Sequence, residues 1–155
     1  MTFEEWLANV PPEISQDPLW QMTVYRQALF IGDLAWHDST KLAQDQRTCK
    51  LSGQLYEAAG GISATIAEGY SRGHSKVQAQ FYEYALGSAR ETRDWYYKGR
   101  HVLGQTVATH RMKLLVHIMK QLLRLIPEHR GRRLSEAMEQ YDASTSLFNT
   151  VPMPE

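Results

Sequence analysis

The sequence has little of several features that mark particular classes of protein. Among its 155 residues there is one cysteine, Cys49, so no internal disulfide can form. No stretch approaches the roughly 18 apolar residues of a membrane span, and the first ten residues lack the basic and apolar regions of a secretion signal. The formal net charge is zero, so overall charge indicates no particular partner. We therefore expect a cytoplasmic protein that is not in the membrane, with residues 1–155 forming a single domain and Cys49 buried in a helix.

Motifs that carry catalysis or metal binding are also missing. The Glu-x-x-His pattern of di-iron helical bundles does not occur. His110 and His117 lie seven residues apart and have lysines nearby, whose positive charge opposes metal binding. Residues 71–76 lack the Gly-Lys-Ser/Thr of a phosphate-binding loop. We predict no catalytic residue, no metal site and no cofactor, and we expect both histidines to lie on the surface of a protein that is not an enzyme.

Helical periodicity is what the sequence does contain. Glycine and proline divide the chain into blocks in which apolar residues recur every three or four positions, and no block alternates with period two. The predicted long helices cover residues 18–43, 46–70, 75–103 and 106–126. Long helices joined by short turns pack antiparallel. The predicted fold is therefore all-α: an antiparallel up-and-down four-helix bundle with short N- and C-terminal helical extensions.

Local signals refine this prediction. Thr2 and Glu5 have the spacing of a capping box, so a short helix is expected over residues 3–9. A second short helix is expected around residues 134–141, followed by a loose tail. Pro127 is expected to end the fourth long helix. The expected inner face of the third helix comprises Val77, Phe81, Tyr84, Ser88, Trp95 and Val102.

Three glycines of the second long helix, Gly60, Gly61 and Gly69, need a physical explanation because glycine destabilises a helix interior. Gly60 and Gly61 each cost about 1 kcal/mol relative to alanine in a helix interior, so we expect another helix to approach closely there. Gly69 is expected to end the helix in the left-handed conformation that glycine adopts readily.

Residues 51–69, LSGQLYEAAGGISATIAEG, and the following YSRGHSKVQAQFYEYALGSARE carry a recognisable pattern. The matching positions are Ile66, Ala67, Glu68, Gly69, Arg72, Phe81, Gly87, Ser88 and Glu91. The two halves of the pattern occur in order on two consecutive predicted helices. They resemble the four-helix bundle proteins that intervening sequences in bacterial 23S rRNA genes encode. A similar bundle is the accessory variability determinant of diversity-generating retroelements.

The resemblance implies a homopentameric ring of four-helix bundles. For the accessory determinant it implies RNA or DNA and a reverse transcriptase as partners. We assign Glu68, Gly69, Arg72 and Glu91 to structure or to the subunit interface. Glu68 lies near a helix C-terminus, where the helix dipole disfavours a carboxylate. We therefore expect Arg72, or an arginine of a neighbouring subunit, to pair with it.

Charge is distributed unevenly along this neutral chain. Residues 1–45 hold two basic and seven acidic residues, whereas residues 86–133 hold eleven Lys/Arg and three acids. On the third helix the basic surface comprises Arg90, Arg93, Tyr97 and Arg100. On the fourth helix it comprises His110, Lys113, His117, Lys120 and Arg124. Arginine and lysine side chains on such surfaces can bind the phosphates of nucleic acids.

The acidic first helix could equally neutralise these basic residues, or they could simply form solvated helix faces. Two functions therefore remain open. The first is a non-enzymatic binding or scaffold protein that assembles as a ring. The alternative is an accessory protein that binds nucleic acid through the third and fourth helices.

Overall fold

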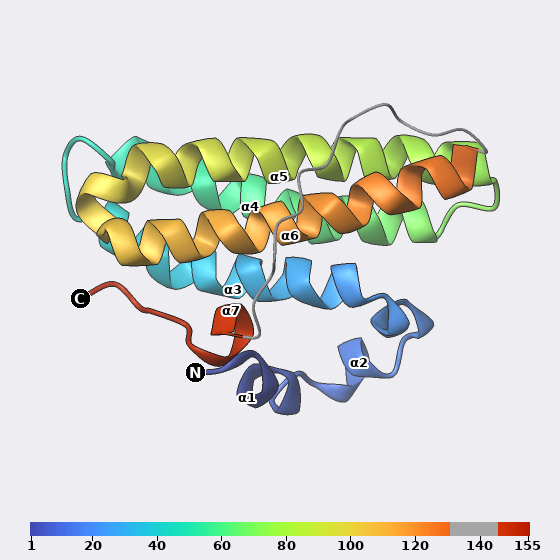
Figure 1. Ribbon diagram of the computed structural model, residues 1–155, viewed down its shortest axis with the longest axis horizontal. Coiled ribbons are helices and arrows are strands. Elements are labelled where there is room, and N and C mark those ends of the chain that lie inside the picture. Colours follow the sequence, from blue (N-terminus) through green and yellow to red (C-terminus); the bar gives the residue numbers. More distant parts are fainter. Residues whose placement is uncertain (131–145) are drawn as a thin grey trace.

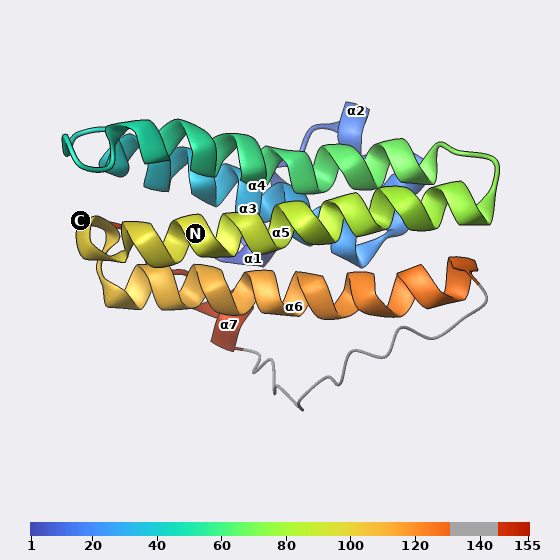
Figure 2. The same cartoon turned by 90° about the horizontal axis from the view of Figure 1, so that it is seen from above.

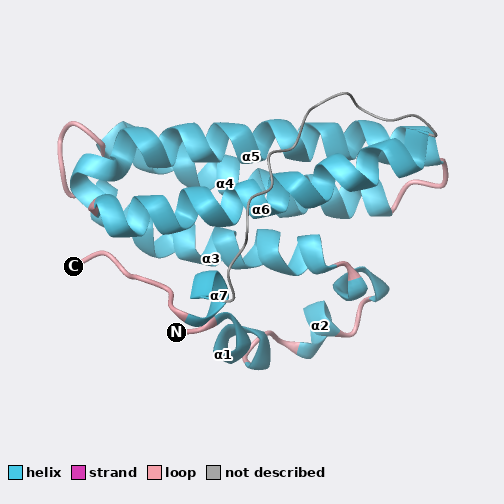
Figure 3. Cartoon of the chain, viewed as in Figure 1, coloured by secondary structure: helices cyan, strands magenta, loops and turns pink. Residues whose placement is uncertain are grey.

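The computed structural model describes residues 1–130 and 146–155. Four long helices dominate it (Figure 1): α3 (Thr23–Leu42), α4 (Cys49–Tyr70), α5 (Ser75–Leu103) and α6 (Gln105–Arg130). The short elements are α1 (Phe3–Ala8), α2 (Pro12–Ser15), the 3-10 helix η1 (Pro18–Gln21) and α7 (Ser146–Asn149). Within these two ranges the chain contains no strand (Figure 3), and none of the helices found there is long and apolar enough to span a membrane.

The four long helices run antiparallel, each packed mainly against the next one in the chain (Figure 2). The contact between α3 and α6, which closes the bundle, is less extensive. In the view of Figure 1 the short helices α1, α2 and α7 lie on the far side of α3 from α5; α1 contacts α3 through Phe3 and Phe30, and α7 contacts α1 and α6. The predicted all-α four-helix bundle with short helical extensions at both ends is therefore confirmed.

An aromatic cluster attaches the two extensions to the bundle. The ring of Phe3 in α1 lies 5.1 Å from that of Phe30 in α3 and 5.3 Å from that of Phe148 in α7. Farther along the C-terminal tail, Val151 packs against the same core. The prediction of a loose tail is wrong, because these apolar side chains find buried surface. The predicted helix over residues 134–141 lies outside the described residues.

The first long helix begins later than predicted. Pro18–Gln21 forms a separate 3-10 turn whose first amide, that of Leu19, donates to the Asp17 carboxylate at 2.8 Å. Met22 is then extended, with ψ 110°, so α3 begins only at Thr23. The capping signal at Asp17 is real, but it starts a single turn.

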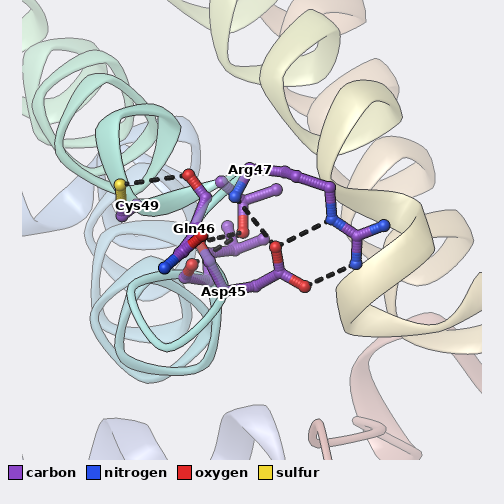
Figure 4. A network of polar contacts seen from close by, with 6 residues as sticks. Asp45, Gln46, Arg47 and Cys49 are labelled. Atoms are coloured by element: carbon purple, nitrogen blue, oxygen red, sulfur yellow. Dashed lines mark hydrogen bonds and ion pairs between the residues drawn. The ribbon is translucent and has the colours of Figure 1, made fainter.

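The second long helix begins at Cys49 rather than at residue 46. The Thr48 hydroxyl donates to the Leu42 carbonyl at 2.7 Å and holds residues 43–48 in a turn. Cys49 therefore lies at the helix end, exposed, with its thiol 3.3 Å from the Gln46 carbonyl oxygen (Figure 4). The expected burial of Cys49 is wrong because the helix starts three residues later than predicted.

The fourth long helix, α6, passes through Pro127 and ends at Arg130. A proline removes one backbone donor, and this loss does not end a helix that is otherwise continuous. The third helix, α5, has the predicted bounds but a different inner face. Its buried residues are Ala79, Tyr82, Ala85, Leu86, Ala89, Thr92, Tyr96, Gly99 and Leu103. Val77 and Tyr84, which were predicted to face the core, are exposed. Alanines such as Ala79 and the hydroxylated Tyr82 face the core in their place.

Gly69 serves close packing and not helix termination. It lies inside α4, and the described glycine with positive φ is Gly104, at 86°, between α5 and α6. A Cβ added at Gly69 would lie 2.7 Å from Phe81 Cβ, so α4 and α5 could not pack as closely. The predicted close approach also holds at Gly61, where an added Cβ would lie 3.4 Å from Ser88 Oγ of α5, but not at Gly60, where an added Cβ would meet nothing within 4 Å.

Candidate interaction surfaces

A fully buried ion pair crosses the middle of the bundle. Arg111 of α6 donates to Asp38 of α3 from Nε to Oδ2 at 2.7 Å and from Nη2 to Oδ1 at 3.2 Å. The Tyr96 hydroxyl of α5 donates to the same Oδ2 at 2.8 Å. All three side chains are buried, and burial raises the pKa of Tyr96 well above its ordinary value, so it remains a donor. The charges satisfy one another inside the core and fix how three helices meet.

Sequence reasoning missed this network, although it contained a signal. Asp38 lies three residues after Ala35 on the apolar face of its helix, and Arg111 lies between Val107 and Leu114 on the apolar face of α6. One acid and one base, each inside an otherwise apolar stripe, indicate a buried pair.

His110 lies inside the protein, which contradicts the predicted surface position. Its Nδ1 is 2.9 Å from Nη1 of Arg111, and a guanidinium can only donate. Nδ1 is therefore the acceptor, and Nε2 carries the proton that it donates to the Leu147 carbonyl at 2.7 Å. Burial is the main reason that the pKa of His110 is lowered. Neutral His110 thus joins the ion pair to α7.

His117 contacts the same C-terminal helix, since its ring lies 5.5 Å from that of Phe148 in an edge-to-face arrangement. Burial lowers its pKa first, and the neighbouring cations Lys120 and Arg124 lower it further. On the next turn of α6, the Gln121 side chain bonds Gln27 of α3. The predicted basic surface of α6 therefore adjoins α3 and α7.

The basic residues of α5 form a second surface, here called the α5 basic flank: Arg90, Arg93, Tyr97 and Arg100. The Arg100 guanidinium lies 4.0 Å from the Tyr97 ring centre and donates to the Tyr97 carbonyl at 2.7 Å. Among the described residues Arg93 forms no ion pair, so the alternative in which the acidic first helix neutralises the basic residues is not seen at Arg93.

The two basic surfaces are separate. On α5, Ser88 faces α4, so at helical spacing the arginines lie on the opposite flank, toward α6. The basic residues of α6 instead lie toward α3 and α7. The residues of α6 between the two surfaces are the half-buried Met112, Val116 and Leu123. The structure thus does not bring the sequence-predicted candidates Lys113, Lys120 and Arg124 together with those of α5.

A third surface, on α3 and α4, was not anticipated. Trp36 is 60% exposed and Tyr56 is 44% exposed, and their ring centres lie 5.6 Å apart in an edge-to-face pair. This α3–α4 aromatic face continues at spacings of three and four residues. Its members are Leu29, Gly32, Trp36, Gly53, Tyr56, Gly60, Ala67 and Tyr70, whereas Ser63, at the same spacing, is buried. None is charged, and a Cβ added at Gly32, Gly53 or Gly60 would meet nothing within 4 Å.

The 23S rRNA-intervening sequence protein family model matches residues 21–124. The chain belongs to this family. The match includes α3, α4, α5 and most of α6, and it leaves α1, α2 and α7 outside. The predicted resemblance is confirmed, whereas the comparison with the accessory variability determinant stays a prediction. No curated protein and no solved structure matches the chain.

The signature residues of this 23S rRNA-intervening sequence protein lie on two parts of the bundle. Glu68 and Arg72 line an open hollow of about 340 Å³ with Ala67 and Ser71. Instead of pairing with Glu68, the Arg72 guanidinium lies 4.7 Å from the Phe81 ring centre. Roughly 15 Å farther along α5, Glu91 is exposed and accepts a hydrogen bond from Trp95 Nε1 at 3.2 Å.

No cluster suited to holding a metal ion occurs in the part of the chain that the structure describes. The most closely converging polar side chains there, Asp38, Tyr96 and Arg111, are enclosed in the core. The α3–α4 aromatic face and the two basic surfaces, by contrast, face outward.

Proposed function

We propose that the protein is a non-enzymatic scaffold that assembles with copies of itself into a closed ring, pentameric as the family resemblance implies. The α3–α4 aromatic face carries this proposal. An exposed tryptophan and tyrosine on an uncharged surface match the composition of protein–protein interface cores, which favour aromatic residues and exclude charges. The open glycines beside them let another backbone approach closely.

The charge of the chain also supports self-association. The formal net charge is zero, so copies of the chain do not repel one another over long range. The polar network of Asp38, Tyr96 and Arg111 is used internally, which supports a structural role for it rather than a catalytic one.

The test is the molar mass of the purified protein, measured by size exclusion with light scattering. We expect a mass near five chains for the parent and a smaller species for Trp36→Ala/Tyr56→Ala. The matched control is Tyr84→Ala, because Tyr84 is 54% exposed, between Tyr56 and Trp36, but lies on α5, outside the aromatic face. A monomeric parent would overturn the proposal, and so would a double variant that keeps the parent mass.

The second candidate function is nucleic-acid binding by the α5 basic flank and the basic residues of α6. Arg93, Lys113 and Arg124 are exposed and form no ion pair with any described residue, so they can meet phosphates. The exposed ring of Tyr97 adds a surface on which a base can stack. A reverse transcriptase as protein partner stays a prediction from the resemblance.

Fluorescence anisotropy with a labelled RNA or DNA oligonucleotide tests this second function. If it is correct, affinity falls steeply between 50 and 200 mM salt, as it does for proteins that contact several phosphates. Affinity should also fall in the Lys113→Glu/Lys120→Glu/Arg124→Glu variant. Equal binding by the parent and this variant would show that the α6 surface is not the site.

A further inference from the structure

We propose that the α3–α4 aromatic face of one copy docks on the α5 basic flank of the next copy. The contact between subunits is then heterologous, with a different surface on each side. This inference names the two surfaces of the proposed assembly, so it rests on the proposed function.

The two surfaces lie on opposite sides of the bundle. Figure 2 shows α4 and α6 on opposite sides of α5. The aromatic face runs along α3 and α4, where Ser39 Oγ donates to the Ser52 carbonyl at 3.1 Å. The basic flank is the side of α5 turned toward α6, away from the contact of Ser88 with α4. One molecule can therefore contact two neighbours at once.

The surfaces are chemically complementary. An arginine guanidinium is weakly hydrated and stacks on the faces of tryptophan and tyrosine. The basic flank offers Arg93 and the Arg100–Tyr97 stack, and the aromatic face offers the Trp36–Tyr56 pair. Both arrangements exist in the single chain, so little side-chain conformational freedom is lost on docking.

Charge also disfavours a symmetric contact in which the basic flanks of two copies face each other. Two basic flanks facing each other would bring like charges together, whereas the aromatic face contains no charged residue. Beside the flank, Met112, Val116 and Leu123 of α6 are half-buried and supply apolar surface for the same contact. A heterologous contact between opposite sides repeats from copy to copy, and it ends only when the ring closes.

Two variants, each with one surface removed, test the pairing. Trp36→Glu/Tyr56→Ala removes the aromatic face, and Arg93→Glu/Arg100→Glu removes the basic flank. Each variant alone is expected to be monomeric. An equimolar mixture is expected to form a dimer with one copy of each, because one intact aromatic face and one intact basic flank remain. Native mass spectrometry distinguishes this mixed dimer from either homodimer.

The control is Lys113→Glu/Arg124→Glu, which removes the same amount of positive charge from the other basic surface and is expected to keep the ring. Circular dichroism confirms that every variant is folded. A mixture that stays monomeric overturns the pairing, as does a basic-flank variant that keeps the ring. A monomeric parent overturns the proposed function itself. If the parent forms a ring and only the aromatic-face variant dissociates it, the proposed function stands but the pairing with the basic flank is wrong.

Discussion

Two aspartate–arginine pairs in this protein have nearly the same geometry and very different surroundings. Asp45 and Arg47 lie two residues apart in the turn between α3 and α4, with a shortest N–O distance of 2.6 Å and the arginine side chain 84% exposed (Figure 4). Asp38 and Arg111 lie 73 residues apart, with a shortest distance of 2.7 Å and both side chains fully buried. The distances alone would rank the two pairs as equal.

The difference shows what burial adds to an ion pair. The local pair needs only its own turn, and water screens its charges. The buried pair needs α3 and α6 in register, and Tyr96 adds α5 to the same network; each charge of the pair has lost its hydration. Removing one partner from the buried pair leaves the other charge without compensation, so this pair constrains the fold far more strongly.

The largest predicted effect comes from breaking the buried pair. Arg111→Met leaves the Asp38 carboxylate buried without its cation and should lower the free energy of unfolding by about 3–5 kcal/mol. Urea unfolding at one fixed protein concentration measures this change. The double variant Asp38→Leu/Arg111→Met, which removes both charges, should recover much of the loss. A single variant as stable as the parent would contradict the role assigned to this pair.

A smaller effect is expected from the third member of the network. Tyr96→Phe removes only the hydroxyl that donates to Asp38 Oδ2, and a hydrogen bond to a charged group contributes about 1.5–3 kcal/mol. The adjacent Tyr97→Phe is the matched control, because the Tyr97 side chain is exposed. Equal urea midpoints for the two variants would show that burial does not strengthen the Tyr96 contact.

The same contrast explains how far the sequence could predict the structure. Long helices follow from local periodicity and turn residues, so the bundle and the bounds of α5 were predictable. Which face of α5 is buried depends on its neighbours, and the predicted inner face included Val77 and Tyr84, which are exposed. The pairing of Asp38 with Arg111 and the meeting of Trp36 with Tyr56 join separate helices. Periodicity within one helix does not determine such contacts.

Acidification should weaken the buried network through His110. Its pKa in the folded protein lies below the ordinary 6.5, so the unfolded chain binds this proton more tightly. The stability that neutral His110 contributes to the folded state is therefore complete above pH 6.5. It is lost as the pH falls through the lowered pKa of the folded state. We expect the melting temperature to drop between pH 7.5 and pH 5, and to drop less in His110→Gln. The control is His37→Gln, which removes an exposed imidazole that takes no part in this network.

The smallest effect belongs to the exposed pair, and it appears in titration rather than in unfolding. Hydrogen bonds from Arg47 lower the pKa of Asp45 from 3.8 to about 2. Arg47→Ala should return the NMR titration midpoint of the Asp45 carboxyl toward 3.8, while the melting temperature at pH 7 stays unchanged. Because the lowered pKa favours the charged form, any contribution of the pair exists above pH 3.8 and is lost toward pH 2. If Asp45 of the parent already titrated near 3.8, water would separate it from Arg47 in solution. The exposed pair would then differ from Asp38–Arg111 in N–O distance as well as in burial.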